Sequence, residues 1–276
     1  MTRRKKPPPQ RKLQQISDSS GWTHVIKGPR GITSLQATGI RLEYGKSTQT
    51  KYTLETYLDR LRKHYAPIWR ESICFKSLSR MFEQDILPAQ NVAVTQCICL
   101  GLGSMTTGSE SSSYELAALI SILGILGKRH HIRDVIFQDP IFNSLDETIL
   151  QSLGYTVVKT PDAFSKLNNT TFLFAPHLEC FHYATALGIA TPVLSIGSDL
   201  QMYIQGLLSS LAESTKQGSC RIFQTFMQKT DSRPMPDFDR TSWCESTRIH
   251  WVKSEEDTSG ENMIEQGIRS MTMAER

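Results

Sequence analysis

Apolar runs and helical periodicity alternate along the middle of the chain. Short apolar runs are typical of buried strands, and the longer periodic segments between them are typical of the helices that cover a sheet. We expect strands at residues 94–100, 133–139, 155–159, 170–175 and 191–197. We expect helices at residues 112–128, 144–154, 162–167, 179–188 and 199–213.

Strands that alternate with helices predict right-handed crossovers and a mostly parallel sheet that is covered on both faces. The predicted fold is a Rossmann-like three-layer α/β domain over residues 90–214. We expect a disordered basic tail at residues 1–20 and an N-terminal segment with amphipathic helices at 21–89. Residues 215–276 form a poorly defined C-terminal extension in this prediction.

The N-terminal helical flank and the C-terminal extension differ in the strength of their patterns. Apolar side chains recur at helical spacing from Leu54 to Tyr65, and a second helix is expected around 69–82. Beyond residue 214, "CRIFQTFMQ" (220–228) and "RIHWVKS" (248–254) could each be a strand or an edge element. The residues between them predict a loop.

Positive charge is concentrated at the N-terminus. The chain has 31 basic and 27 acidic residues, and six basic residues lie among the first twelve: Arg3, Arg4, Lys5, Lys6, Arg11 and Lys12. The rest carries 25 basic against 27 acidic residues, so we expect no nucleic-acid partner. The "RRKK" run could direct nuclear import, although a solvated tail is the simpler interpretation.

The cysteines and the apolar runs indicate the compartment. Six cysteines are scattered without a Cys-x-x-Cys pair, as in a protein with reduced thiols. The longest apolar run, 116–126, is too short to span a bilayer, and the basic N-terminus does not resemble a secretory signal. We expect a cytoplasmic protein, with the nucleus as a second compartment and no membrane association.

Glycines and polar residues follow the predicted strands. Ligands of open parallel sheets bind beyond the carboxyl ends of the strands, so these residues are the candidates for cofactor or ligand binding: Gly101, Gly103, Ser104, Asp139, Gly197, Ser198 and Asp199. His177 is the candidate catalytic acid or base, with Asp139 as the second candidate. Asp139 or Asp199 could orient the imidazole, although a histidine bonded to a loop backbone is the simpler interpretation.

The glycine turn after the first strand could be a nucleoside or phosphate cradle, or only a tight turn. Glycine at 101 and 103 would let a ligand approach the amides at the start of the next helix. A dinucleotide fingerprint needs a third glycine, where Thr106 stands, and an acidic residue about 20 positions on. Asp139 is 36 residues after Gly103. A structural turn is therefore favoured over a cradle for a nucleotide or S-adenosylmethionine, and no cofactor can be named.

Two other chemistries find little support. His177, Cys180 and His182 offer nitrogen and sulfur to zinc, but no second cluster completes four ligands, so we predict no metal site. Ser198 lacks the Gly-x-Ser-x-Gly elbow of a hydrolase. A helix N-cap formed by Ser198 or Asp199 is the commoner explanation.

Five segments in order resemble the sensitivity-to-red-light-reduced (SRR-like) family: "CICLGLGS", "YELAAL", "VIFQDPIFNSLDETILQSLGYTVV", "TTFLFAPH" and "VLSIGSDLQMYI". The resemblance covers 94–204, with an upstream echo in "GWTHVIKG" (21–28). It implies a regulatory protein with protein partners. Plant members of the family are associated with light signalling and the circadian clock, and fungal and animal relatives with cytoskeletal or haem-related regulation. It implies no established reaction.

The resemblance also assigns positions. The family's recurrent residues fall on Gly101, Gly103, Asp139, Pro140, Glu147, Leu153, Gly154, Pro176 and His177. This chain departs from the family where Glu115 stands in place of the usual Gln, and where Leu178 replaces a Cys. It departs again at Ser198 and Asp199, which replace Asn and Ser. If these positions bind a ligand, the ligand or its affinity differs in this chain.

The leading hypothesis is a regulatory protein that binds a small ligand at this edge of the sheet without established catalysis. One alternative is a nucleoside-cofactor-dependent enzyme, such as an S-adenosylmethionine-dependent transferase, with His177 or Asp139 as acid or base. Another is a protein-interaction scaffold that acts through residues 21–85. The observation that separates them is whether the strand-end side chains converge around an open cavity or whether helices and the N-terminal flank fill it.

Overall fold

The computed structural model describes residues 13–17, 23–27, 52–208 and 213–253. It divides the chain into two units, Met1–Ser47 and Thr48–Arg276. The first contains an antiparallel hairpin of β1 (Leu13–Ser17) and β2 (Thr23–Lys27). This hairpin spans the boundary expected between the basic tail and the N-terminal segment. The predicted domain boundaries stay predictions.

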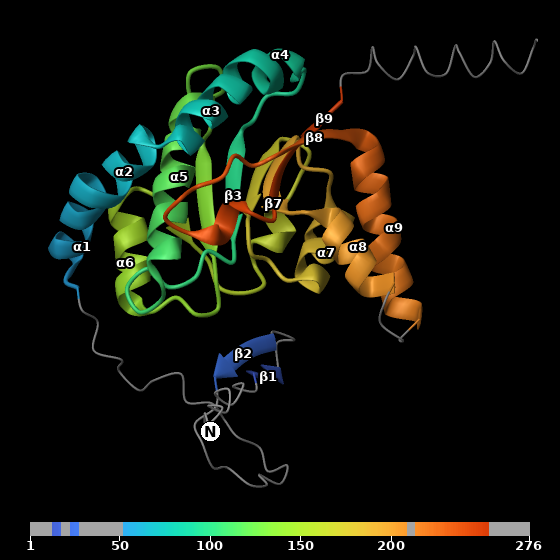
Figure 1. The fold of residues 1–276 in the computed structure, drawn as a ribbon, viewed down its shortest axis with the longest axis horizontal. Helices are drawn as coiled ribbons and strands as arrows, with labels where there is room; N and C mark the ends of the chain where they lie inside the picture. Colours follow the sequence, from blue (N-terminus) through green and yellow to red (C-terminus); the bar gives the residue numbers. More distant parts are fainter. Residues whose placement is uncertain (1–12, 18–22, 28–51, 209–212, 254–276) are drawn as a thin grey trace, which may run out of the picture. The chain divides into compact units, whose positions relative to one another are not determined.

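The second unit is built on a seven-stranded sheet with the order β5-β4-β3-β6-β7-β9-β8 (Figure 1). Five strands are parallel: β3 (Gln96–Leu100), β4 (Asp134–Gln138), β5 (Thr156–Val157), β6 (Thr171–Ala175) and β7 (Leu194–Ser198). β9 (Thr247–Val252) runs antiparallel to β7, and β8 (Thr230–Pro234) runs antiparallel to β9. The predicted Rossmann-like α/β fold is confirmed.

Apolar runs form the central strands because helices cover both faces of the sheet. β6 is buried at all five of its positions, and β3 at its last four. Cys97 of β3 pairs with Val135 of β4 on one side and with Phe172 of β6 on the other. Strands buried on two faces are apolar throughout instead of alternating, as observed here.

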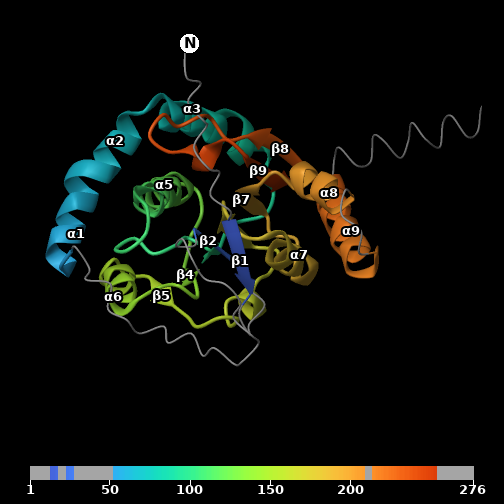
Figure 2. The same ribbon diagram turned by 60° about the horizontal axis from the view of Figure 1, so that its bottom comes forward.

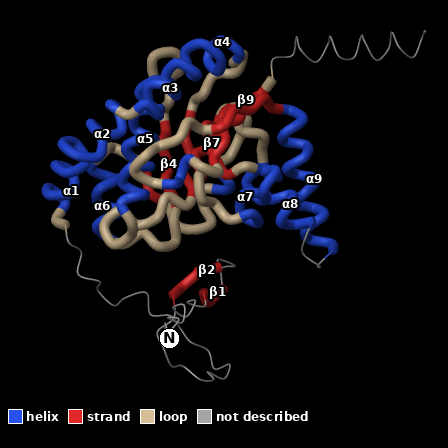
Figure 3. Tube along the Cα trace, viewed as in Figure 1, coloured by secondary structure: helices blue, strands red, loops and turns tan. Residues whose placement is uncertain are grey.

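Helices enclose the sheet (Figure 3). They are α5 (Glu110–Leu126), α6 (Ser144–Ser152), η3 (Phe164–Lys166), α7 (Cys180–Ile189), α8 (Leu200–Leu208) and α9 (Glu213–Lys229). Figures 1 and 2 show α5, α6 and the N-terminal helices toward one side of the sheet and α7, α8 and α9 toward the other. Gly154, the expected end of α6, has a φ of 85°, which suits the residue after a helix.

The predicted N-terminal flank is helical. It runs through α1 (Leu54–Arg60), η1 (Leu61–Tyr65), α2 (Ala66–Glu71), α3 (Ile73–Met81), η2 (Phe82–Ile86) and α4 (Leu87–Ala89). Thr53 begins it with a capping box. Tyr57, Tyr65 and Trp69 are fully buried, and the flank packs on α5 and α6. It is part of the core and not an appendage.

Two expectations for the C-terminal extension are wrong. The segment 220–228 is part of α9 and is not a strand; its buried Phe223 and Phe226 are three residues apart, on one face of a helix. β8 lies in the segment expected to be a loop, because an edge strand of polar residues gives no apolar signal. The segment 248–254 contains most of β9, which follows the short helix η4 (Ser242–Cys244).

The cysteines are free thiols, as predicted, and five of the six are buried. Burial raises the pKa of Cys99 well above its ordinary value, with Glu115 and Asp139 contributing negative charge nearby. In the part of the chain that the structure describes, no helix combines the length and the apolar character needed to cross a membrane.

Candidate functional site

The predicted site residues lie at the carboxyl ends of four neighbouring parallel strands, β4, β3, β6 and β7. From β3 the chain continues to β4 and β5 on one side, and it returns to β6 and β7 on the other. The strand order therefore reverses between β3 and β6, and ligands of open α/β sheets bind at such a switch point. The glycine turn after β3 and the His177 loop after β6 flank this point.

Backbone conformation and packing explain why glycine stands at positions 101 and 103. Gly101 and Gly103 have φ values of 72° and 83°, a region that other residues adopt only with strain. A Cβ atom on Gly103 would lie 2.6 Å from the Ser112 hydroxyl of α5, whereas a Cβ on Gly101 would make an ordinary contact of 3.5 Å with Leu178. The close approach at Gly103 is that of the protein's own helix.

Aspartate carboxylates of the protein accept hydrogen bonds from the backbone amides of this turn. The Gly103 N–H donates to Asp139 Oδ2 at 2.7 Å, and those of Met105 and Thr106 donate to Asp146 Oδ1 at 3.0 and 3.1 Å. Six amides between residues 101 and 108 donate to acceptors within the chain: Gly101, Gly103, Met105, Thr106, Thr107 and Gly108. The turn is therefore not an open cradle for an anion.

Asp146 is the central residue of this closure, and the sequence analysis did not single it out. Its side chain is fully buried, and Oδ1 also accepts from the Thr106 hydroxyl while Oδ2 accepts from the Asn143 N–H. Asn143 and Asp146 form a capping box at the start of α6, which is a signal present in the sequence. The resemblance pointed instead to Glu147, which is exposed.

Ser104 contributes to the same closed network. It is 2% exposed, and its hydroxyl oxygen accepts from the Thr107 N–H and hydroxyl and from the Asn143 side-chain amide. Asp139 likewise accepts from the Ile141 N–H. These predicted site residues hold the turn together.

The residues after β7 also hold the structure. A Cβ on Gly197 would collide with the buried Tyr183 hydroxyl. The Ser198 hydroxyl donates to the Pro176 carbonyl at 2.8 Å. Asp199 accepts from the Gln201 N–H at the start of α8 and lies 3.8 Å from Arg248. Asp199 thus acts as the predicted helix cap.

His177 is a predicted site residue whose side chain stays accessible to solvent. Its side chain is 49% exposed, and Nε2 lies 3.4 Å from Oε1 of Glu115. The hydrogen bond to Glu115 raises the pKa of the imidazole above its ordinary value of 6.5, although partial burial opposes the shift. The partner is Glu115, and not Asp139 or Asp199 as the sequence suggested.

Glu115 is a site residue that the sequence analysis recorded only as a departure from the family. It lies on α5 and is 1% exposed, and the Ser111 hydroxyl donates to its Oε1 at 2.8 Å. Its Oε2 is buried without a hydrogen-bond partner among the described residues. The available signal was an acidic residue, Glu115, one turn into the apolar part of a helix.

The loop that carries His177 is fixed from α8 and β7. Ser198 donates to the carbonyl of Pro176, and the Tyr203 hydroxyl donates to the carbonyl of Leu178 at 2.6 Å. Both residues adjacent to His177 are therefore held by side-chain hydroxyls. Leu178 lies beside Gly101 of the glycine turn, where a Cβ atom would be 3.5 Å from its side chain, so the two loops are neighbours at the switch point.

A cavity of about 540 Å³ lies beside the glycine turn. Its lining consists of Met105–Glu110 loop residues, Ser113 of α5, and three side chains from the N-terminal segment, Tyr52, Arg60 and Tyr65. The strand-end residues predicted from the sequence do not line this cavity. The N-terminal flank supplies its outer wall.

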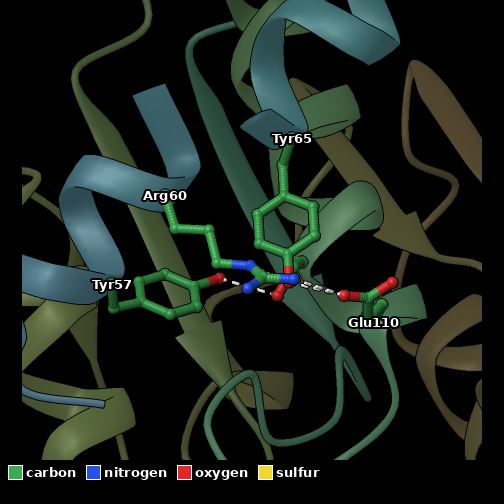
Figure 4. A network of polar contacts seen from close by, with 5 residues as sticks. Tyr57, Arg60, Tyr65 and Glu110 are labelled. Carbon is green, nitrogen blue, oxygen red and sulfur yellow. Dashed lines mark hydrogen bonds and ion pairs between the residues drawn. The ribbon is translucent and has the colours of Figure 1, made fainter. Parts of the chain in front are cut away.

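Figure 4 shows how that wall is attached. Arg60 donates from Nη2 to Glu110 at 2.7 Å and from Nε to the Tyr65 hydroxyl at 3.0 Å. The Tyr57 hydroxyl donates to Ser113 at 3.0 Å. The guanidinium lies 5.3 Å from the centre of the Tyr65 ring, within cation–π range. Four of the lining residues, Arg60, Tyr65, Glu110 and Ser113, therefore already have hydrogen-bond partners within the protein.

A larger cavity of about 900 Å³ lies between residues 71–74 and residues 237–245, away from the predicted site residues. Among the residues that the structure describes, no group of three or more histidine, cysteine or acidic side chains is placed to hold a metal ion. His182, part of the His-x-x-Cys-x-His run, lies 3.8 Å from Glu179.

The chain is similar to solved structures of methyltransferases, but only at low identity. Two solved structures are a putative O-methyltransferase from Klebsiella pneumoniae, with 13% identity and a TM-score of 0.35, and an O-methyltransferase from Bacillus cereus in complex with SAH, with 14% and 0.37. Each alignment covers 73% of this chain and 90% of the other. Likeness at this level carries no conclusion about activity. No curated protein matches the chain.

The family comparison is decisive where the structural neighbours are not. The model of the SRR1 domain matches residues 70–256. This range contains β3 to β9 with all of their intervening helices, including both loops at the switch point. The chain therefore belongs to the SRR1 domain family.

Proposed function

We propose that the protein is an intracellular regulatory protein that binds a small ligand at the carboxyl edge of its sheet, without established catalysis. The observation that carries this proposal is the placement of His177. A half-exposed imidazole stands at the switch point, a buried carboxylate holds one of its nitrogens, and neighbouring hydroxyls fix its loop. Side chains held in this way are typical of binding sites, where orientation is established before the ligand arrives.

The glycine turn narrows the class of ligand in this proposal, because the turn is unsuited to bind a phosphate group. Its amides donate to Asp139 and Asp146, so a phosphate placed there would meet two carboxylates instead of free N–H groups. The ligand that we propose therefore binds without a phosphate on this turn. Free nucleotides and dinucleotides are expected to be poor ligands.

A thermal-shift screen of the full chain tests the proposal. The compounds are small carboxylic acids, polyols, S-adenosylmethionine, nicotinamide dinucleotides, nucleotides, haem and divalent metals. A ligand present at 100 times its Kd stabilises the folded state by about 2.7 kcal/mol, which raises the Tm by about 5 °C or more in a chain of this size. We expect such a shift from a compound without phosphate.

Matched histidine variants show whether the shift comes from the proposed site. His177→Ala should abolish it, whereas His131→Ala should retain it, because His131 is an exposed residue before β4 at the other end of the strands. A shift that survives in His177→Ala would contradict the proposed site. The absence of a shift from every compound would contradict ligand binding and favour a protein-interaction scaffold.

A second candidate function is a transferase that uses a nucleoside cofactor. Asp139 favours it: the residue ends the strand next to the glycine turn, where dinucleotide-binding folds place the acid that binds ribose. Its separation of 36 residues from Gly103 arises because the long helix α5 lies between the two strands. Both Asp139 oxygens already accept backbone N–H groups, however. A shift with S-adenosylmethionine that disappears in Asp139→Asn would support this candidate.

A further inference from the structure

One imidazole nitrogen of His177 interacts with the protein, and the other has no hydrogen-bond partner among the described residues. Nε2 faces Glu115 at 3.4 Å. The residues described in the structure provide no hydrogen bond to Nδ1, and the side chain is 49% exposed. When both nitrogens carry protons, Nδ1–H is a donor without a partner in the described chain. A ligand that reaches the switch point would meet this N–H group.

Glu115 favours the doubly protonated ring. The carboxylate is buried, and only Oε1 has partners among the described residues, namely Ser111 and His177. A buried carboxylate without a counter-charge is costly, so the imidazolium compensates it. Glu115 therefore both holds the ring in place and keeps it charged.

The other ionisable groups near the loop have their own surroundings. Glu179 and Cys180 begin α7, and Glu179 lies beside His182 instead of His177. Tyr203 on α8 donates to the loop backbone. Asp199 lies beside Arg248, and Asp139 accepts from the glycine turn. Glu115 is thus the charged group in hydrogen-bonding contact with His177 within the described residues.

We infer that Glu115 and His177 form a recognition pair in which the imidazolium Nδ1–H binds a carboxylate group of the ligand. This inference rests on the proposed function and names its ligand class. One imidazolium matches the single charge of a carboxylate, and such charge-assisted hydrogen bonds are stronger than neutral ones. A dianion such as sulfate or a phosphate ester would carry a second negative charge toward the Asp139 and Asp146 carboxylates of the glycine turn. Glu115 is a positioning residue, and His177 touches the ligand.

The pair is tested first in the ligand-free full chain, by nuclear magnetic resonance of the histidine side chains over a range of pH. His177→Gln identifies the resonance. We expect His177 to titrate above 6.5 in the wild type. Glu115→Gln, which keeps the shape of the side chain and removes its charge, should lower that midpoint. Glu179→Gln neutralises an acid two residues from His177 and should leave the midpoint unchanged.

The ligand class is tested with acetate, sulfate and tetramethylammonium at matched ionic strength and at a pH below the His177 midpoint. Acetate should shift the His177 resonance to saturation, and about fivefold to tenfold more acetate should be needed in Glu115→Gln. Sulfate, a dianion at this pH, should bind more weakly than acetate, and tetramethylammonium should have no effect. A pH midpoint that is the same in Glu115→Gln, or acetate and tetramethylammonium acting alike, would overturn the inference.

These results can be separated from the fate of the proposed function. A ligand from the thermal-shift screen that binds Glu115→Gln as tightly as the wild type leaves the proposed function in place and overturns the inference. A His177 midpoint that falls in Glu115→Gln, combined with a screen in which no compound stabilises the protein and an acetate titration that leaves the His177 resonance unchanged, shows that the two side chains interact but contradicts both the carboxylate ligand and the proposed function.

Discussion

The loops after β3 and β6 are neighbours at the switch point, and they use their polar groups in opposite ways. The loop after β3 has the glycines expected of a ligand cradle, yet the carboxylates of Asp139 and Asp146 accept the hydrogen bonds of its amides. The loop after β6 has no glycine turn, yet it presents a half-exposed imidazole with a fixed orientation. Glycines give a backbone freedom to turn, but whether the turn binds a ligand depends on what its N–H groups already contact.

The largest effect should come from opening the closed loop. In Asp146→Ala the amides of Met105, Thr106 and Asn143 lose their acceptor in a buried site. Each unsatisfied buried donor costs about 1 to 3 kcal/mol, so we expect a loss of about 3 kcal/mol or more in urea denaturation. Glu147→Ala, on the adjacent exposed residue, should change stability by less than about 0.5 kcal/mol. Equal losses in the two variants would contradict the closed-loop description.

A second comparison sets His177 against His250 of β9, which is buried and has no carboxylate partner among the described residues. Burial lowers the pKa of His250 from 6.5 to about 4, with Arg248 adding to the shift. The unfolded chain therefore binds a proton before the folded one as the pH falls. We expect stability to fall by about 3 kcal/mol between pH 6.5 and pH 4 from this group.

His177 should act in the opposite direction because its folded-state pKa is raised. Its contribution is fully present below pH 6.5 and is lost as the pH rises through the folded-state pKa.

The His250 prediction is tested by urea denaturation of His250→Gln between pH 6.5 and pH 4. The free energy of unfolding should fall less steeply with decreasing pH in this variant than in the wild type. An unchanged pH dependence would mean that His250 is not the group that destabilises the fold.

The sequence predicted the parallel sheet because buried strands and their helices have distinct periodicities. It was less informative where a strand lacks apolar residues, as in β8, or where a short apolar run belongs to one face of a helix, as in α9. The strand-end residues could be located from the sequence because each directly follows a strand that its apolar run had predicted. The partner of His177 could not be predicted, because Glu115 lies far away in the sequence and meets His177 only when the chain has folded.

An intermediate effect should come from Gly103→Ala. The positive φ of 83° strains any Cβ by about 1 to 2 kcal/mol, and the Ser112 hydroxyl would lie 2.6 Å from the new atom. Gly101→Ala has the same backbone strain without the clash, so it should be less destabilising in a thermal melt. The double variant Gly103→Ala with Ser112→Ala should recover the difference. If Ser112→Ala gives no recovery, the close approach of α5 does not explain this glycine.

The smallest effect should come from loosening the open loop. Tyr203→Phe removes the hydroxyl that donates to the Leu178 carbonyl, and Tyr183→Phe removes a buried hydroxyl that bonds to Ser195 without touching the loop. Each loss should cost about 1 kcal/mol in urea denaturation. Only Tyr203→Phe should also shift and broaden the His177 resonance, because it frees the residue next to the imidazole. If the two variants change that resonance equally, the Tyr203 hydroxyl does not fix the loop, and the orientation of His177 depends on Glu115 and on the Ser198 hydrogen bond to Pro176.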